Sequence, residues 1–529
     1  MNIKKYLMLG GAVMTLGLVT PSCVGDLDLE PIDPSQIFAD PSSPEFVSRS
    51  FAQCYALLGL CGNADPGSSN LTVPDAGASV YTRLLFEMEC FPSDEAFWVW
   101  EDNGLRDMCT TSFSASNKQV EIAYSRFYQH IAVCNDFLAN TEGATDEATV
   151  LMRNEVRALR ALTYYWVCDI FGNGTFITAA PNGETIPEQM PRAELYSWLV
   201  TELTDLVDNR RLSTDPVYGR VGLDGAEALL ARVYLNAEVY TGGPVPGSWE
   251  KCLACCNNII NRHKGGGFQG SGLAEHYLYL FSRDNEQYMP GGGNKAENEI
   301  LWGVPFDQDK MQSYGGTTFY LAGALSDGRY GMTSPWSCLT AREPLSNRFE
   351  GGDLRTQLWI RSNGIENQGF LDFAIAGYQA IKWTNLTPDG LGGFSDNINS
   401  NAFCSADLAL IRLADVYLMR AECYLHGAGN LTDALAGVNY LRDRAGVAPF
   451  DALDEQTLLD ERSRELYYEM TRRSDLIRFG RYTGNRQDVW PWKGNSRQGQ
   501  RIDSRYNLMP IPTNILSTQP SLKQNPGYN

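Results

Sequence analysis

The most constraining feature of this sequence is the stretch Asp460–Tyr482, DERSRELYYEMTRRSDLIRFGRY, which combines a helical period with a high density of charge. Its apolar residues recur at steps of seven, four and seven, at Leu459, Leu466, Met470 and Ile477. That spacing puts all four on one face of a helix with 3.6 residues per turn. Pairs of opposite charge lie one turn apart around this face: Glu461 with Arg464, and Glu469 with Arg472 or Arg473. The stretch therefore predicts a helix with one buried face and salt bridges around it.

The chain as a whole has the composition of a large globular protein. Of its 529 residues, 43% are hydrophobic and 20% are charged, which provides enough apolar surface for a sizeable core. The formal net charge of −20 argues against binding nucleic acid through its phosphates. We therefore expect no nucleic-acid partner, and an acidic surface that suits neutral ligands.

Metal and cofactor sites are not indicated. The histidines are far apart in the sequence: His130, His263, His276 and His426. The CxxCC group at Cys252, Cys255 and Cys256 lacks the second pair that a zinc site needs, so we interpret these thiols as small buried hydrophobes. Two cysteine pairs could form bridges in an oxidising compartment: Cys54 with Cys61, and Cys90 with Cys109.

Catalytic motifs are also missing from the sequence. It contains no G-x-S-x-G, H-E-x-x-H, Walker loop or G-x-G-x-x-G. Glu87, Glu89, Asp94 and Glu95 could in principle supply the carboxylate pair of a glycoside hydrolase. A chain with 63 acidic residues offers such pairs by chance, so we predict a binding protein and not an enzyme.

The N-terminus has the layout of a lipoprotein signal peptide over residues 1–22. Lys4 and Lys5 precede an apolar run from Tyr6 to Val19, which is too short to span a membrane. The run leads to Cys23, the expected acceptor for N-terminal lipidation. We expect the mature chain to begin at this residue and to be anchored to a membrane by acyl chains.

Helical pairs recur along the chain. Their predicted ranges are Lys118–Asn140 with Thr145–Phe171, Pro191–Leu212 with Val221–Thr241, and Ala406–Gly427 with Leu431–Gly446. Small residues at matching points in units of about 34 residues are typical of tetratricopeptide repeats. The stretch 265–405 differs, because it is rich in glycine and carries aromatics without a helical period. We predict a mainly all-α fold, a single body over 23–529, with tetratricopeptide-like repeats within about 44–263 and 406–482, a loop-rich insert at about 265–405, and a tail at 483–529.

Several motifs resemble one known family. They are Glu461–Gly480, E-R-x-R-E-L-x-x-E-x-x-R-x-x-D-L-x-R-x-G; C-x-x-x-L-D-x-x-P from Cys23; Glu155–Gly172; L-x-P-I-P at Leu508–Pro512; and L-x-Q-N-P-G-Y at Leu522–Tyr528. All resemble the SusD/RagB family, the outer-membrane nutrient-binding lipoproteins of Bacteroidetes, which commonly have glycine where this chain has Met470. In the charged stretch, we expect Arg472, Asp475 and Arg478 to join the C-terminal tail to the repeats by charge-assisted hydrogen bonds.

This resemblance implies a function at the cell surface. A SusD-like protein, lipid-anchored in the outer membrane, captures an oligosaccharide and passes it to a SusC-like TonB-dependent transporter. Two alternatives remain open from the sequence. One is a RagB-like protein that holds a peptide by strand-like backbone bonds, and the other is a repeat scaffold that binds only proteins.

Candidate ligand-binding residues come from two loops. A neutral sugar presents apolar C–H faces and hydroxyl groups, so its site needs exposed aromatic rings beside polar side chains. The stretch 93–103 meets this description, and alternation in an extended segment would put two of its tryptophans on one side. With the family's second loop, the candidates are Trp98, Trp100, Asp102, Asn103, Tyr314, Tyr330 and Trp336. The alternative is that these aromatics only anchor the insert to the helices.

Overall fold

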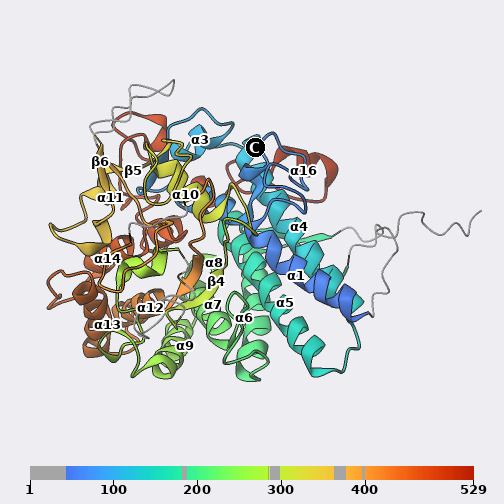
Figure 1. Cartoon of the computed structure of the whole chain (residues 1–529). Helices are drawn as coiled ribbons and strands as arrows, with labels where there is room; N and C mark the ends of the chain where they lie inside the picture. Colours follow the sequence, from blue (N-terminus) through green and yellow to red (C-terminus); the bar gives the residue numbers. More distant parts are fainter. Residues whose placement is uncertain are drawn as a thin grey trace, which may run out of the picture.

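The computed structural model describes residues 43–180, 187–283, 285, 298–362, 377–395 and 400–528. The predicted signal peptide and Cys23 lie outside the described residues. Within them the fold is mainly helical and its strands are short (Figure 1), which confirms the predicted all-α class. None of the helices in these ranges combines the length and the apolarity needed to cross a membrane.

The N-terminal part is built around a long helical hairpin. Its helices are α1 (Pro44–Gly59), α2 (Tyr81–Glu89), α3 (Leu105–Cys109), α4 (Lys118–Asn140) and α5 (Glu147–Trp166). The side chain of Asn117 caps α4 by accepting from the backbone N–H groups of Gln119 and Val120. α5 continues as a π-helical turn, η4 (Val167–Phe171), and the chain turns away at Gly172, where φ is 72°. α4 packs on α5, which confirms the predicted pair.

A stack of helices continues this hairpin along one side of the molecule. It contains α6 (Arg192–Asp208), α7 (Leu223–Leu235), α8 (Ala237–Thr241), α9 (Ser248–His263), α12 (Leu413–Leu425) and α13 (Leu431–Arg444) (Figure 1). α6 packs on α7, α7 on α9, α9 on α12 and α12 on α13. Small residues allow this close packing: a Cβ at Gly437 of α13 would lie 2.7 Å from the ring of Tyr417 on α12. The stack is the predicted tetratricopeptide-like scaffold.

The residues between α9 and α12 contain short elements that pair with distant parts of the chain. They are β4 (Ile300–Val304), α10 (Gly316–Ala324), β5 (Leu339–Ala341), α11 (Glu343–Ser346), β6 (Ile360–Ser362), β7 (Gly377–Gln379) and β8 (Leu408–Arg412). β5 pairs antiparallel with β1 (Ala96–Trp98), β4 with β8, and β6 with β7. The prediction of a helix from Ala406 was therefore wrong at its start, because residues 408–412 form β8.

The predicted long helix at 460–482 is two helices with a sharp turn between them. α14 (Glu455–Leu466) ends before Tyr468 and Met470, whose φ angles are 65° and 58°, and α15 (Arg472–Arg478) follows. The backbone N–H of Tyr468 donates to Glu95 at 3.1 Å, and the Nζ of Lys382 donates to the Tyr467 carbonyl at 2.7 Å. These distant partners hold the turn in place, so the prediction of one continuous helix was wrong.

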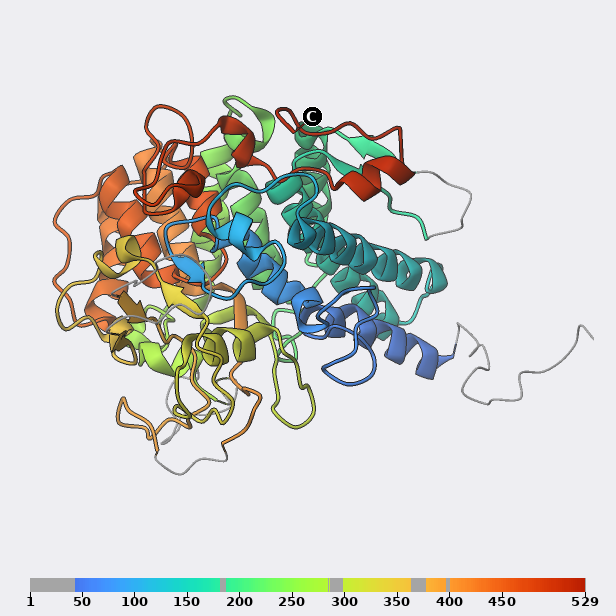
Figure 2. The ribbon, with the colours of Figure 1, turned by 90° about the horizontal axis from the view of Figure 1, so that it is seen from above.

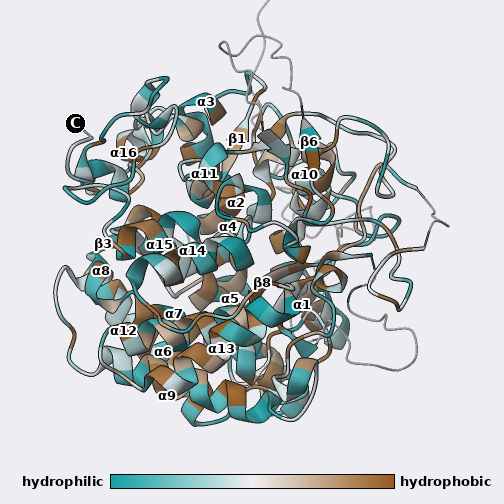
Figure 3. Cartoon of the chain, turned by 90° about the vertical axis from the view of Figure 1, so that its left-hand side faces the viewer, coloured by the Kyte–Doolittle hydropathy of each residue, from teal (hydrophilic) through white to brown (hydrophobic). Residues whose placement is uncertain are grey.

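From Glu461 to Asp475, the charged side chains of α14 and α15 are buried at the centre of the molecule, where Figure 3 shows these two helices as largely hydrophilic. The predicted pair Glu461–Arg464 forms, with Nε 2.7 Å from the carboxylate. Glu469 instead pairs with Arg412 at 2.7 Å and with Lys382. We expected salt bridges around a buried apolar face, but here the ion pairs themselves are part of the interior.

Of the three residues predicted to join the C-terminal tail to the repeats, none pairs with any tail residue that the structure describes. Arg472 binds Asp94, Asp475 binds Arg462, and Arg478 binds Glu422 of α12. The predicted link to the repeats exists through Glu422, but the residue that reaches the tail is Arg473, which donates to the Asn507 carbonyl at 2.7 Å. Figure 2 shows the tail crossing to the N-terminal hairpin, where α16 (Thr513–Thr518) lies.

Every cysteine in the described residues is a buried free thiol. Cys54 and Cys61, and Cys90 and Cys109, are therefore not joined, and the interpretation of the CxxCC group as buried small side chains is confirmed. The same residues contain no group of three or more histidine, cysteine or acidic side chains that could hold a metal ion.

Buried His130 of α4 gives folding a pH dependence. Its Nε2 lies 2.8 Å from the Cys54 carbonyl and its Nδ1 2.7 Å from the Thr163 hydroxyl. Burial lowers the pKa of His130 from 6.5 to about 4. The stabilisation of the folded state by neutral His130 is therefore complete above pH 6.5 and is lost as the pH falls toward 4. Between pH 7.5 and 4.5, urea unfolding should show wild type losing about 2 to 3 kcal/mol more stability than His130→Gln. Equal losses would contradict this assignment.

Candidate functional site

Aromatic side chains from three parts of the chain form a continuous series of ring contacts. Phe319 of α10 stacks on Trp98 of β1 at 5.0 Å, and it also contacts Trp336 at 6.4 Å. Tyr314 is 6.3 Å from Trp336, and Trp100 is 5.8 Å from Trp98. We call Trp100, Trp336 and Tyr314 the aromatic platform, because they are the partly or fully exposed members. Trp100 is 41% exposed and Tyr314 is 38% exposed.

Trp98 has a supporting role and is not itself available to a ligand. Its ring is only 1% exposed, and its Nε1 donates to Asp102 at 2.7 Å. Alternation correctly placed it beside Trp100, but the ring belongs to the core beneath the platform. The prediction that Trp98 contacts the ligand directly is therefore replaced. Its ring instead positions Trp100 and Asp102.

Strand pairing brings the two predicted loops together. The backbone N–H of Val99 donates to the Cys338 carbonyl at 2.8 Å, beside the β1–β5 pair. The backbone N–H of Trp336 donates to the Ala322 carbonyl at 2.7 Å, which fixes Trp336 against α10. Because β1 and β5 are far apart in sequence, the platform exists only in the folded chain.

Polar groups border the platform. Asp102 is half-buried and Asn103 is exposed, as a sugar site requires. The structure adds two residues that the sequence analysis missed, Asp75 and Arg83. The guanidinium of Arg83 lies 4.5 Å from the centre of the Phe319 ring, and its Nη1 is 3.4 Å from the Asp75 carboxylate, whose side chain is 61% exposed.

A buried acid lies beneath this border. Arg83 Nε donates to Glu87 at 2.8 Å. Burial raises the pKa of Glu87 to about 7, although Arg83 acts in the opposite direction. The only sequence signal for Arg83 was a basic residue within the apolar helix YTRLLFEME, and a buried arginine commonly has a structural partner of this kind.

Within the described ranges of the chain, no ring contact joins Tyr330 to the platform. Its hydroxyl donates to the Leu358 carbonyl at 3.1 Å, and its own carbonyl accepts from the Asn385 backbone N–H. Its φ is 51°, in a region that non-glycine residues seldom occupy. The structure thus brings six of the seven predicted residues together and places Tyr330 as an anchor of its own loop.

The acidic residues considered for catalysis are buried, and their carboxylates accept hydrogen bonds from other parts of the chain. Asp94 accepts from Arg472 at 2.7 Å, Glu89 from Arg473 at 2.9 Å, and Glu95 from Ser463 and Tyr468. Burial raises the pKa of Glu95 to about 7 and that of Glu89 to about 8. Each side chain is at most 1% exposed, so none of them can face a sugar.

Comparison with known proteins decides the family. The SusD family matches over residues 257–528, and the starch-binding protein SusD of Bacteroides thetaiotaomicron is 30% identical over 99% of each chain. The chain belongs to the SusD family. This confirms the resemblance that its motifs indicated.

Solved structures of SusD-like proteins share the fold. A SusD superfamily protein from Parabacteroides distasonis is 21% identical, covers 92% of this chain and 99% of its own, and has a TM-score of 0.66. Surface glycan-binding protein A from Bacteroides thetaiotaomicron, solved in complex with laminarihexaose, is 18% identical, covers 91% of this chain and 99% of its own, and has a TM-score of 0.68. The relative that is 30% identical is named as a starch-binding protein, which agrees with the predicted class, a binding protein and not an enzyme.

Proposed function

We propose that this SusD-like protein binds starch-type α-glucan chains on its aromatic platform. The observation that supports this most strongly is the aromatic platform, in which Trp100 and Tyr314 are exposed and Trp336 is half-buried, bordered by Asp75, Asp102 and Asn103. The relative that is 30% identical over 99% of this chain is a starch-binding protein.

The ring geometry favours a curved ligand over a flat one. The planes of Trp336 and Tyr314, two of the platform rings, are inclined by 48° to each other. Rings inclined in this way follow a bent surface, and an α-1,4-linked glucan is a helical chain with a curved apolar face. Each ring can cover a sugar C–H face while the bordering carboxylates and amides accept or donate hydrogen bonds to hydroxyl groups.

The same proposal includes location and partner. We propose that residues 1–22 are removed, that Cys23 carries the lipid anchor at the cell surface, and that 23–529 forms one mature body. The captured oligosaccharide would then pass to a SusC-like TonB-dependent transporter. The signal-like N-terminus and membership of the SusD family support this part.

Calorimetry on protein lacking residues 1–23 tests the ligand. Titrations would use maltoheptaose, laminarihexaose, cellohexaose and a mixed peptide pool under the same conditions. We expect exothermic, saturable binding of maltoheptaose. Saturation by a β-glucan alone would move the proposal to that glycan, heat from peptides alone would favour the RagB-like alternative, and silence with all four would contradict capture by the isolated chain.

Asp75 offers a more local test of the platform border. Asp75→Ala should lower maltoheptaose affinity by about tenfold, because a carboxylate that accepts from a sugar hydroxyl contributes about 1 to 2 kcal/mol net. Asp136→Ala on α4 removes the same charge from an exposed position and should leave affinity unchanged. Isothermal titration of both variants, with melting temperatures as a folding check, makes the comparison. Equal affinities would exclude Asp75 from the site.

A further inference from the structure

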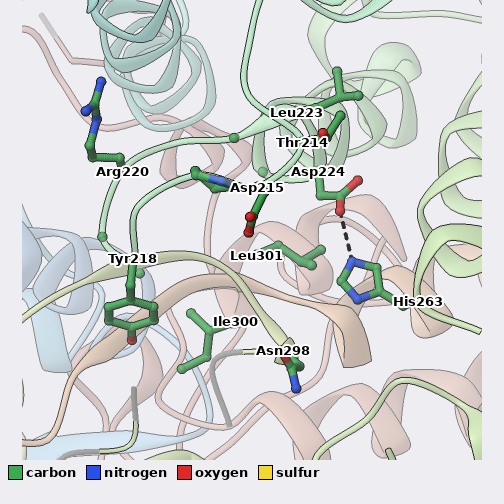
Figure 4. A pocket seen from close by; sticks show the side chains of 15 residues that line it. Thr214, Asp215, Tyr218, Arg220, Leu223, Asp224, His263, Asn298, Ile300 and Leu301 are labelled. Atoms are coloured by element: carbon green, nitrogen blue, oxygen red, sulfur yellow. Dashed lines mark hydrogen bonds and ion pairs between the residues drawn. The ribbon is translucent and has the colours of Figure 1, made fainter. Parts of the chain in front are cut away.

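A cavity of about 300 Å³ lies between the helical scaffold and strand β4. Its walls come from the loop after α6, the start of α7, the end of α9 and strand β4 (Figure 4). None of the elements that carry the platform contributes to it. The polar side chains around it include Thr214, Asp215, Asp224, His263 and Asn298.

The walls of this cavity are held close by glycines. Gly219, with φ 82°, allows the loop to approach the ring of Pro305, because a Cβ there would lie 2.5 Å from it. A Cβ at Gly225 of α7 would lie 2.8 Å from the Leu301 carbonyl of β4. Tyr218 and Ile300 supply the apolar part of the lining. The cavity is therefore a defined feature of packing between α7 and β4.

The charges around the cavity determine which ligand it suits. His263 Nε2 lies 2.9 Å from Asp224 (Figure 4), and Arg262 also pairs with Asp224. Arg220 is paired with Glu155 at 2.5 Å. With these cations engaged by carboxylates, the lining offers no strong attraction for an anion.

Hydrogen-bonding groups nevertheless remain at the cavity. Asp215 is exposed, and within the part of the chain that the structure describes, its carboxylate and the Thr214 hydroxyl form no hydrogen bond or ion pair. Figure 4 shows the Asp215, Asp224, His263 and Asn298 side chains around one space, with Tyr218 and Ile300 on one side. Carboxylate, amide and hydroxyl groups beside an apolar wall suit a neutral ligand that carries many hydroxyl groups.

We propose that this cavity is a second carbohydrate site, which holds one or two neutral sugar residues. The inference rests on the proposed glycan-binding function, because it names a second place where the same class of ligand is held. A volume of about 300 Å³ is at the small end of ligand pockets, which limits the site to a short segment or a chain end. Two sites on one protein raise the effective concentration of a long glycan at each of them.

The test separates the two sites by mutation. The platform variant Trp100→Ala/Tyr314→Ala leaves the cavity intact, and saturation-transfer difference NMR with maltose should still show weak binding. Adding Asp215→Ala and Asn298→Ala should lower that residual affinity at least tenfold. Asp208→Ala with Asn209→Ala is the matched control, because it removes the same side-chain types from exposed positions at the end of α6 and should change nothing.

The outcomes distinguish the two proposals. A platform variant that shows no transfer from maltose, or a residual signal that Asp215→Ala/Asn298→Ala leaves unchanged, overturns the second site alone. Wild type that binds none of the glycans in the calorimetric panel overturns the proposed function instead. Melting temperatures within a few degrees of wild type show that the substitutions, all at surface positions, leave the fold intact.

Discussion

Replacing both Trp100 and Tyr314 by alanine is expected to lower the affinity for maltoheptaose by at least about 100-fold, while the fold is retained. Aromatic anchors at the centre of a binding surface typically contribute about 2 kcal/mol or more each. Both rings are more than a third exposed, so their removal leaves no large cavity in the core. Isothermal titration calorimetry measures the affinity, and the melting temperature serves as the folding check.

Two further variants make this result specific. Trp98→Ala should unfold more easily than wild type by about 3 to 5 kcal/mol, because a buried tryptophan is truncated; its loss of binding would follow from loss of structure. Trp249→Ala on α9 removes a half-buried ring that stacks on His426, and it should bind maltoheptaose as wild type does. Unchanged affinity in the Trp100→Ala/Tyr314→Ala protein would exclude the platform as the glycan site.

Much of the helical scaffold follows from local signals in the sequence. α4 spans Lys118–Asn140 as predicted, because its apolar residues keep the helical period and Asn117 is a strong N-cap. α13 begins at Leu431 after Asn430, which caps it in the same way. Periodicity and caps are properties of neighbouring residues, so they can be recognised without knowing the fold.

The break between α14 and α15 could not be found in this way. Leu466 and Met470 remain at helical spacing although the backbone between them leaves the helix. The turn is fixed by Glu95 and Lys382, which are distant in sequence. The one available sign was in the resemblance to the family, whose pattern has glycine at the position of Met470; the φ of this residue is 58°, where glycine would be less strained.

Only part of the candidate site could be predicted, because the rest of it also depends on contacts between residues that are distant in sequence. Residue type and alternation selected Trp100, and the resemblance to the family selected Trp336; the structure includes both in one series of ring contacts. The burial of Trp98 depends on Phe319, more than two hundred positions away. Asp75 carried no pattern of its own, and the one sign at Arg83, a basic residue within an apolar helix, did not indicate a position beside the platform.

Replacing Glu465 by alanine is expected to destabilise the protein by about 3 to 5 kcal/mol, because it leaves buried arginines without their carboxylate. Glu465 is fully buried and accepts from three guanidinium groups, of Arg355 at 3.1 Å and of Arg412 and Arg444 at 2.8 Å. These arginines come from the insert, from β8 and from α13. Their common acceptor therefore joins three parts of the chain, and its removal should harm folding before binding.

Urea unfolding followed by circular dichroism measures this loss, and the exposed pair Arg486–Glu455 provides the control. Glu455→Ala removes a carboxylate from the same helix at a side chain that is 54% exposed, so it should cost no more than about 1 kcal/mol. Equal losses for the two variants would show that the buried network adds nothing beyond a surface pair.

Acid provides an independent check on Glu465. Burial acts to raise its pKa, but Arg412, Arg444 and Arg355 outweigh burial and lower the pKa from 4.5 to about 2. The contribution of ionised Glu465 to the free energy of unfolding is therefore complete above pH 4.5. About 3 kcal/mol of it is lost as the pH falls toward 2. Wild type should lose this stability in that interval and Glu465→Ala should not, so the gap between them in unfolding free energy should narrow as the pH falls from 4.5. A gap that stays constant would mean that Glu465 is not held as an ion among these arginines.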